Sequence, residues 1–143
     1  MEVGKNFENE FAFLLSNEIK KQDLFVETQY KRLDIAIFDE EKELNSIIEI
    51  GHYSLNQALM KKLKAKEDID KRNGKYSGKK IFHIQLIDDI DNKNYKYQRR
   101  NKPKIKEYYN LYKDSNLSYK LILKKINSKL GSITTYIIIS RKK

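Results

Sequence analysis

The chain has 143 residues and no cysteine. It is therefore the length of one ordinary domain, and it can form neither a disulfide framework nor a Cys-based zinc site. The formal net charge is +10, but residues 1–70 carry −5 and residues 71–143 carry +15. This asymmetry suits a cation site in the first half and a polyanion partner in the second, although a solvated lysine-rich surface would leave the same signature.

Neither end of the sequence looks like a membrane or export signal. Residues 1–16 mix acids with only a short apolar run, and the apolar stretch Tyr136 to Ile139 is too short to cross a bilayer. We therefore expect a soluble cytoplasmic protein that does not bind a membrane.

Hydrophobic periodicity predicts an α/β protein with a mixed sheet flanked by helices. In chain order, the predicted elements are a helix over 6–21 with Asn6 as its N-cap, a strand over 24–30, strands over 33–38 and 46–50 joined by the loop 39–43, a helix over 54–71 ended by Asn73-Gly74 and Ser77-Gly78, a strand over 80–87, a helix opened by Lys102-Pro103 and running through Tyr112, and a hairpin of strands 119–126 and 133–140. We interpret residues 1–143 as a single domain, with a core over 6–90 and a basic, aromatic-rich extension over 91–143.

The hairpin formed by the second and third predicted strands places two acids together. If its loop centres on residues 41 and 42, opposed residues have numbers that sum to about 83. Phe38 then faces Asn45, Ala36 faces Ile47, and Asp34 faces Glu49, while the isoleucines 35, 37, 48 and 50 form the opposite, buried surface. Two opposed carboxylates repel, so a cation between them would stabilise the pair, and oxygen ligands suit Mg²⁺ or Mn²⁺. The alternative is that both acids simply face water.

The segments Arg32-Leu33-Asp34-Ile35-Ala36-Ile37-Phe38 and Ile47-Ile48-Glu49-Ile50-Gly51-His52-Tyr53 resemble the PD-(D/E)XK nuclease superfamily. Its members carry an Asp at the start of one strand and Glu-x-Lys at the end of the next, after a helix bearing a further acid. The resemblance covers roughly residues 6–87 and implies a restriction-endonuclease-like αβββαβ core. It also implies that Asp34 and Glu49 bind the metal, that the Ile50 carbonyl adds a ligand, and that Glu10 or Glu8 completes the acidic shell. The implied chemistry is metal-assisted hydrolysis of a phosphodiester bond.

The chain departs from the family pattern at Gly51, where the family has its lysine. That lysine orients the attacking water and stabilises charge on the phosphate, and a glycine can do neither. Three explanations remain open. The cation comes from Lys61 or Lys62 on the following helix, or from Lys31. Alternatively, His52 or Gln57 shares the role. Otherwise, the fold is kept and the chemistry is lost.

The two histidines are predicted to be mainly structural. Strand parity places His52 on the face opposite Glu49, unless the strand ends at Gly51 and the chain turns there. His83 lies in an apolar strand, which is typical of a core histidine with its hydrogen bonds satisfied.

The segment from residue 93 to residue 104 interleaves cations with aromatic residues. Such side chains can neutralise phosphates and stack on exposed bases. The predicted nucleic-acid-binding residues are Lys93, Tyr95, Lys96, Tyr97, Arg99, Arg100, Lys102 and Lys104. The tyrosines that follow, at 108, 109 and 112, are instead expected to pack on the core.

Three functions fit the sequence. The first is a Mg²⁺- or Mn²⁺-dependent nuclease, with DNA more favoured than RNA as its substrate; the resemblance implies that it could act as a homodimer. The second is a catalytically inactive nuclease-like subunit that binds nucleic acid or a protein partner. The third is a basic RNA-binding protein whose acid pair is structural.

Overall fold

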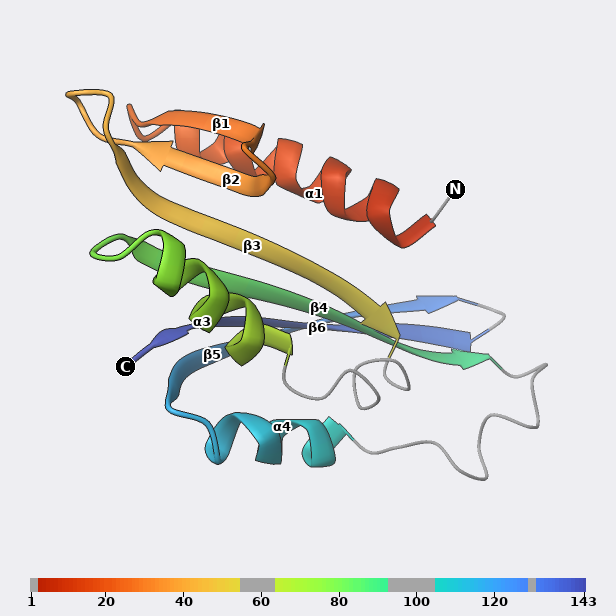
Figure 1. The fold of residues 1–143 in the computed structure, drawn as a ribbon. Coiled ribbons are helices and arrows are strands. Elements are labelled where there is room, and N and C mark those ends of the chain that lie inside the picture. The colour runs from red at the N-terminus through yellow and green to blue at the C-terminus, as the bar shows by residue number, and fades with distance from the viewer. Residues whose placement is uncertain (1–2, 55–63, 93–104, 129–130) are drawn as a thin grey trace.

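The fold is known from a computed structural model, which describes residues 3–54, 64–92, 105–128 and 131–143. These residues form three helices and one six-stranded sheet with the strand order β1-β2-β3-β4-β6-β5 (Figure 1). The elements are α1 (Val3–Lys20), β1 (Phe25–Tyr30), β2 (Leu33–Phe38), β3 (Leu44–Ser54), α3 (Lys64–Lys75), β4 (Lys80–Asn92), α4 (Ile105–Lys113), β5 (Leu117–Ser128) and β6 (Gly131–Lys142).

The sheet is mixed, as predicted. β3 and β4 run parallel, whereas the other neighbouring strands run antiparallel. A parallel pair needs a connection that crosses back over the sheet, and α3 forms part of that connection. β6 pairs with β4, so the second half of the chain continues the same sheet.

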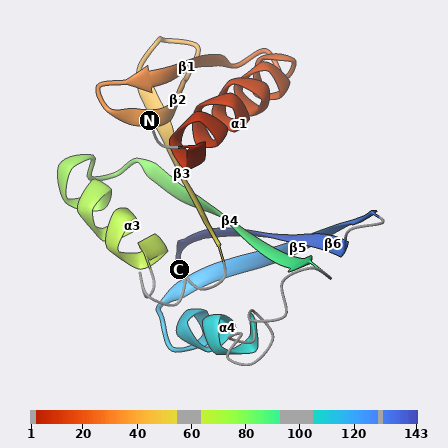
Figure 2. The ribbon, with the colours of Figure 1, turned by 90° about the vertical axis from the view of Figure 1, so that its right-hand side faces the viewer.

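Helices cover both faces of the sheet (Figure 2). α1 packs on one face over a cluster of buried side chains that consists of Ala12, Val26, Ile35, Ile48, Ile50, Ile84 and Leu86. α3 and α4 pack on the other face over a cluster that includes Leu33, Ala36, Ile47, Ala65, Ile69, Tyr108 and Tyr112. The buried positions of Tyr108 and Tyr112 confirm that these tyrosines belong to the core.

The predicted hairpin register is confirmed along most of β2. Ala36 faces Ile47 and Ile35 faces Ile48. The prediction is wrong at Phe38, which faces Leu44 in place of Asn45, because the register shifts between Ile37 and Phe38. The shift lies beside the turn, where Lys42 adopts a φ of 63° and its N–H bonds the Asp39 carbonyl. The two acids lie at the other end of β2 and are unaffected by it.

Several predicted element ends are also wrong. α1 begins at Val3, so Asn6 lies inside the helix and is not its N-cap. β3 continues to Ser54, where a helix was expected to begin, and Asn73-Gly74 lies within α3 and does not end it. β4 runs to Asn92, beyond the predicted end at residue 87, because β6 pairs with it from Phe82 to Asn92.

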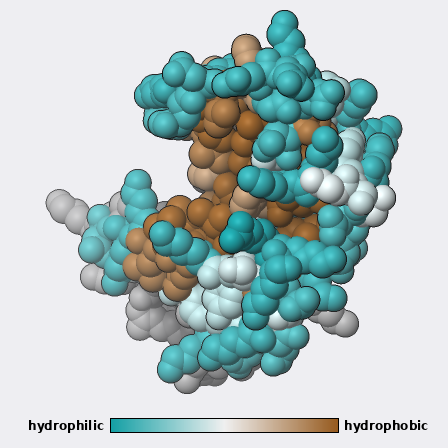
Figure 3. Space-filling view, turned by 90° about the vertical axis from the view of Figure 1, so that its left-hand side faces the viewer, coloured by the Kyte–Doolittle hydropathy of each residue, from teal (hydrophilic) through white to brown (hydrophobic). Residues whose placement is uncertain are grey.

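The surface at one end of the sheet is hollowed, and apolar side chains line the hollow (Figure 3). In the part of the chain that the structure describes, the helices are too short or too polar to span a bilayer.

Candidate metal and active site

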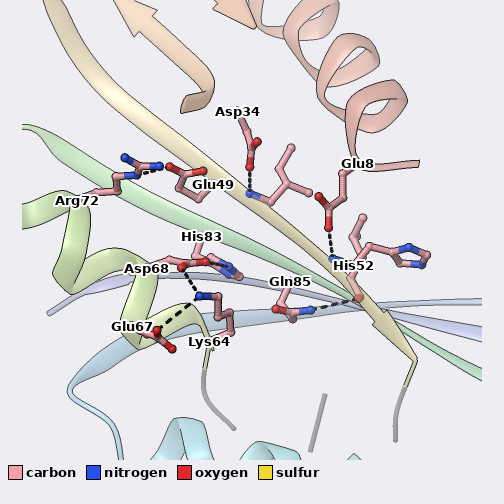
Figure 4. Close-up of polar contacts among 12 residues, drawn as sticks. Glu8, Asp34, Glu49, His52, Lys64, Glu67, Asp68, Arg72, His83 and Gln85 are labelled. Carbon is pink, nitrogen blue, oxygen red and sulfur yellow. Dashed lines mark hydrogen bonds and ion pairs between the residues drawn. The ribbon is translucent and has the colours of Figure 1, made fainter. Parts of the chain in front are cut away.

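Asp34 and Glu49 come together through the pairing of β2 with β3. One step beyond the observed Ile35–Ile48 pair, the same register brings Asp34 opposite Glu49, on the face of the sheet that α3 covers. Asp34 Oδ2 accepts a hydrogen bond from the backbone N–H of Ile50 at 2.7 Å, and this bond fixes the half-buried carboxylate against β3 (Figure 4). The geometry expected from alternation along the hairpin is therefore present.

Glu49 is only 7% exposed, and its environment favours the neutral acid. Burial, followed by the negative charge of Asp34 and a hydrogen bond between the two carboxyl groups, raises the pKa of Glu49 to about 8. Arg72 opposes this shift, because its Nε lies 2.5 Å from Glu49 Oε1. The surroundings of Glu49 therefore favour retention of its proton.

Arg72 reaches the acid pair from the last turns of α3. Its side chain is 18% exposed, and Nη2 also donates to the Arg32 carbonyl at 3.4 Å. The sequence predictions did not include this residue, although Arg72 follows buried Ala65 and Ile69 at helical spacing. That spacing was the available signal that Arg72 points toward the sheet.

The acid pair suits a divalent cation in its donor chemistry. Asp34 Oδ2 and Glu49 Oε1 are used in the contacts above, the two carboxyl groups also contact each other, and a metal ion could take the place of a proton between them. Among the residues placed by the structure, no three His, Asp or Glu side chains form a metal-binding group. A cation here would therefore draw its remaining ligands from water and backbone carbonyls, as Mg²⁺ commonly does. That the Ile50 carbonyl is one of them stays a prediction.

Gly51 sits against Gln85 on the neighbouring strand β4. A Cβ added at Gly51 would lie 2.9 Å from Gln85 Oε1 and 3.3 Å from Tyr53 Cε2. Gln85 is fully buried, its Nε2 donates to the Leu86 carbonyl at 3.3 Å, and Oε1 has no partner within the described structure. A side chain at position 51 would therefore have to displace this amide. The packing around position 51 thus suits a glycine.

His83 lies beside Glu49 in the pairing of β3 with β4, and Ser140 lies beside His83 in β6. His83 is fully buried, as predicted, but its hydrogen bonding is poorer than expected: Nε2 lies 3.3 Å from Asp68 Oδ2 at an angle unsuited to a hydrogen bond. Burial raises the pKa of Asp68, but its contacts with His83 and Lys64 outweigh that effect and leave the pKa below its usual value. His83 therefore lies between Glu49 of the acid pair and a second acidic residue on α3, Asp68.

His52 points to the opposite face, as strand parity predicted, because β3 continues past Gly51 and His52 pairs with Leu86. Its Nε2 lies 2.6 Å from Asp88 Oδ2, and its backbone N–H donates to Glu8 Oε1 at 3.0 Å (Figure 4). The hydrogen bond to His52 is the main cause of the lowered pKa of Asp88. Glu8 thereby joins α1 to β3, whereas Glu10 is exposed.

Several predicted residues take no part in these contacts or lie outside the described residues. Lys31 is exposed, and its Nζ lies 5.2 Å from the centre of the Tyr30 ring. Gln57, Lys61 and Lys62 lie outside the described ranges, and so do all eight predicted nucleic-acid-binding residues between Lys93 and Lys104. Their roles stay predictions.

No protein-family model, curated protein or solved structure matches this chain.

Proposed function

We propose that this protein is a divalent-metal-dependent nuclease that hydrolyses phosphodiester bonds in DNA, built on a restriction-endonuclease-like fold. The observation that carries the proposal is the buried Asp34–Glu49 pair, whose environment raises the pKa of Glu49 to about 8. A bound divalent cation would favour ionisation of both carboxyl groups and so would relieve the repulsion between them. Perturbed acids of this kind also cluster at functional sites.

The arrangement of the elements supports the same proposal. A helix precedes three antiparallel strands, and α3 leads into a fourth strand parallel to the third, in the order expected for the PD-(D/E)XK core. Asp34 lies near the start of β2, as the resemblance implies, whereas Glu49 lies in the middle of β3 and not at its end. A bound Mg²⁺ or Mn²⁺ would polarise the phosphate and lower the pKa of an attacking water.

Arg72 supplies the positive charge that Gly51 lacks. Its Nε holds Glu49, and its guanidinium retains N–H groups beyond those bonded to Glu49 and to the Arg32 carbonyl. A planar guanidinium can bind a carboxylate and a phosphate oxygen together. In this proposal, Arg72 positions Glu49 and stabilises negative charge on the scissile phosphate, which is one part of the family lysine's role.

The proposal is tested by cleavage of supercoiled plasmid and of labelled single-stranded and duplex DNA, with Mg²⁺, Mn²⁺ or EDTA. We expect Asp34→Asn and Glu49→Gln each to abolish metal-dependent cleavage while the protein stays folded. Asp70→Asn removes an exposed carboxylate from α3 and serves as the matched control. Equal cleavage by the wild type and both site variants would contradict the assignment.

Two observations favour a second function, a nuclease-like binding module without catalysis. Gln85 packs where a side chain at position 51 would begin, and Arg72 already occupies one oxygen of Glu49. If this is the function, the purified protein binds DNA but cleaves none of these substrates with either metal. Cleavage that both site variants abolish would reject it.

A further inference from the structure

A second charged site lies at the end of the sheet where β4 begins and β6 ends. A cavity of about 240 Å³ opens there beside the last turns of α3. Figure 1 shows the start of β4, the end of α3 and the C-terminus at the same end of the molecule. The cavity is lined by Ile69, Asn73, Lys79, Lys80, Ile81, Phe82, Arg141, Lys142 and Lys143.

Five of these nine residues are cations, and no acidic residue is among them. Lys79 and Lys80 lie where β4 begins, and the other three cations come from residues 141–143. The fold brings these distant segments together, because Phe82 of β4 pairs with Arg141 of β6. Within the part of the chain that the structure describes, none of the five side chains forms an ion pair. Like charges gathered without partners repel one another, so an anion in the cavity would stabilise the arrangement.

We propose that this basic pocket binds phosphate groups of a nucleic-acid backbone. Its volume is below the roughly 300–1,000 Å³ of pockets that enclose drug-sized ligands, so it suits a small group presented by a longer molecule. Lysine and arginine bind phosphate through charge, and Asn73 adds a neutral donor on α3. Contacts of this kind fix the position of a nucleic acid without reading its sequence.

The pocket lies close to the acid pair along the sheet. Lys80 precedes His83 by three residues on β4, and His83 lies beside Glu49, which gives a separation of about 10 Å along the strand. Asn73 directly follows Arg72 on α3. The pocket lies outside the proposed active site, so its binding of nucleic acid does not depend on catalysis.

Anisotropy of labelled single-stranded and duplex DNA, measured in EDTA over about 50–200 mM salt, tests the proposal without cleavage. The pocket variant is Lys79→Gln/Lys80→Gln/Arg141→Gln. The control, Lys21→Gln/Lys42→Gln/Lys66→Gln, removes the same charge from lysines that do not line the cavity. We expect the pocket variant to lose about two to three units of the log–log salt slope and at least about tenfold in affinity, with a smaller change in the control. Equal changes in the two variants would overturn the proposal.

A second arm separates backbone phosphate from free phosphate. Inorganic phosphate, added at constant ionic strength, should displace DNA only weakly, because one small anion replaces few of the contacts. Saturable phosphate binding that the pocket variant loses, together with unchanged DNA affinity, would assign the pocket to a free anion and overturn the backbone proposal. Lys80→Glu provides a single-residue check, since Lys80 is exposed and its charge reversal should weaken DNA binding without unfolding the protein.

Discussion

The acid pair lies on β2 and β3 and the basic pocket at the start of β4 and the end of β6, and the charges of the two sites have opposite environments. Glu49 is buried, and both acids are held by protein groups, Glu49 by Arg72 and Asp34 by the Ile50 N–H. Four of the five pocket cations are exposed and remain hydrated. At the acid pair, burial raises the pKa of Glu49. At the basic pocket, the exposed cations keep their charge, and dissolved salt screens their attraction for an anion. The two sites should accordingly respond to different experiments.

The largest difference is expected in catalysis. Arg72→Gln removes the cation beside Glu49, and we expect turnover at saturating DNA to fall by about 10²–10³-fold. Arg72→Lys should recover part of the activity, since it keeps the charge but loses the planar fork. The pocket triple variant should raise KM and leave kcat nearly unchanged. Steady-state kinetics of the two Arg72 variants and the pocket triple variant, each compared with the wild type, measure kcat and KM. If the pocket variant lost as much kcat as Arg72→Gln, the two sites would not have separate roles in catalysis and DNA binding.

The second difference lies in the pH dependence of stability. In the unfolded chain, Glu49 loses its proton near the ordinary glutamate pKa of 4.5, whereas the folded protein keeps it to about pH 8. The folded state therefore binds more protons between these values, and its free energy of unfolding should fall as pH rises, by at most about 1.4 kcal/mol per pH unit from this group. The lowered pKa values of Asp68 and Asp88 act below this window, because the stability that they add is lost only as pH falls through their folded values.

Chemical denaturation in EDTA at a series of pH values measures this dependence. Glu49→Gln should flatten the curve between about pH 5 and pH 8, whereas the pocket triple variant should keep the wild-type slope. An unchanged slope in Glu49→Gln would show that the carboxyl titrates normally in the folded protein.

Mn²⁺ affinity should depend on the acid pair and not on the basic pocket. Because a cation must displace the proton on Glu49, Mn²⁺ affinity should rise by up to about tenfold per pH unit until about pH 8, and then level off. Calorimetry in buffers of different ionisation enthalpy measures the released proton directly. The pocket variant should bind Mn²⁺ as the wild type does, while Asp34→Asn should not bind it. Affinity independent of pH would place the metal elsewhere.

The acid pair could be predicted from the sequence because a hairpin register follows from local alternation, which also placed His52 on the far face. Contacts made across the parallel connection could not be predicted in this way. Arg72 and Glu49 are 23 residues apart and meet only when α3 folds back over β3. The basic pocket is harder still to foresee, since Lys80 and Arg141 become neighbours only through β4–β6 pairing. Asp88 and Asp89 look like the end of a strand, yet β4 continues through them because β6 supplies its hydrogen-bonding partner.

The smallest expected effect concerns Gly51, which packs against Gln85. In Gly51→Ala, the new Cβ meets Gln85 Oε1 at 2.9 Å, and the amide must turn within a fully buried site. We expect a loss of stability of about 1–2 kcal/mol, and a smaller loss when the substitution is made in a Gln85→Ala background, because the obstructing atoms are then absent. Lys80→Gln in the exposed pocket should change stability by less than about 0.5 kcal/mol. Denaturant unfolding of the wild type, Gly51→Ala, Gln85→Ala and the double variant gives the coupling energy between positions 51 and 85. Equal losses in the two backgrounds would mean that Gln85 does not close this position, and that the absence of lysine from position 51 has a cause other than packing.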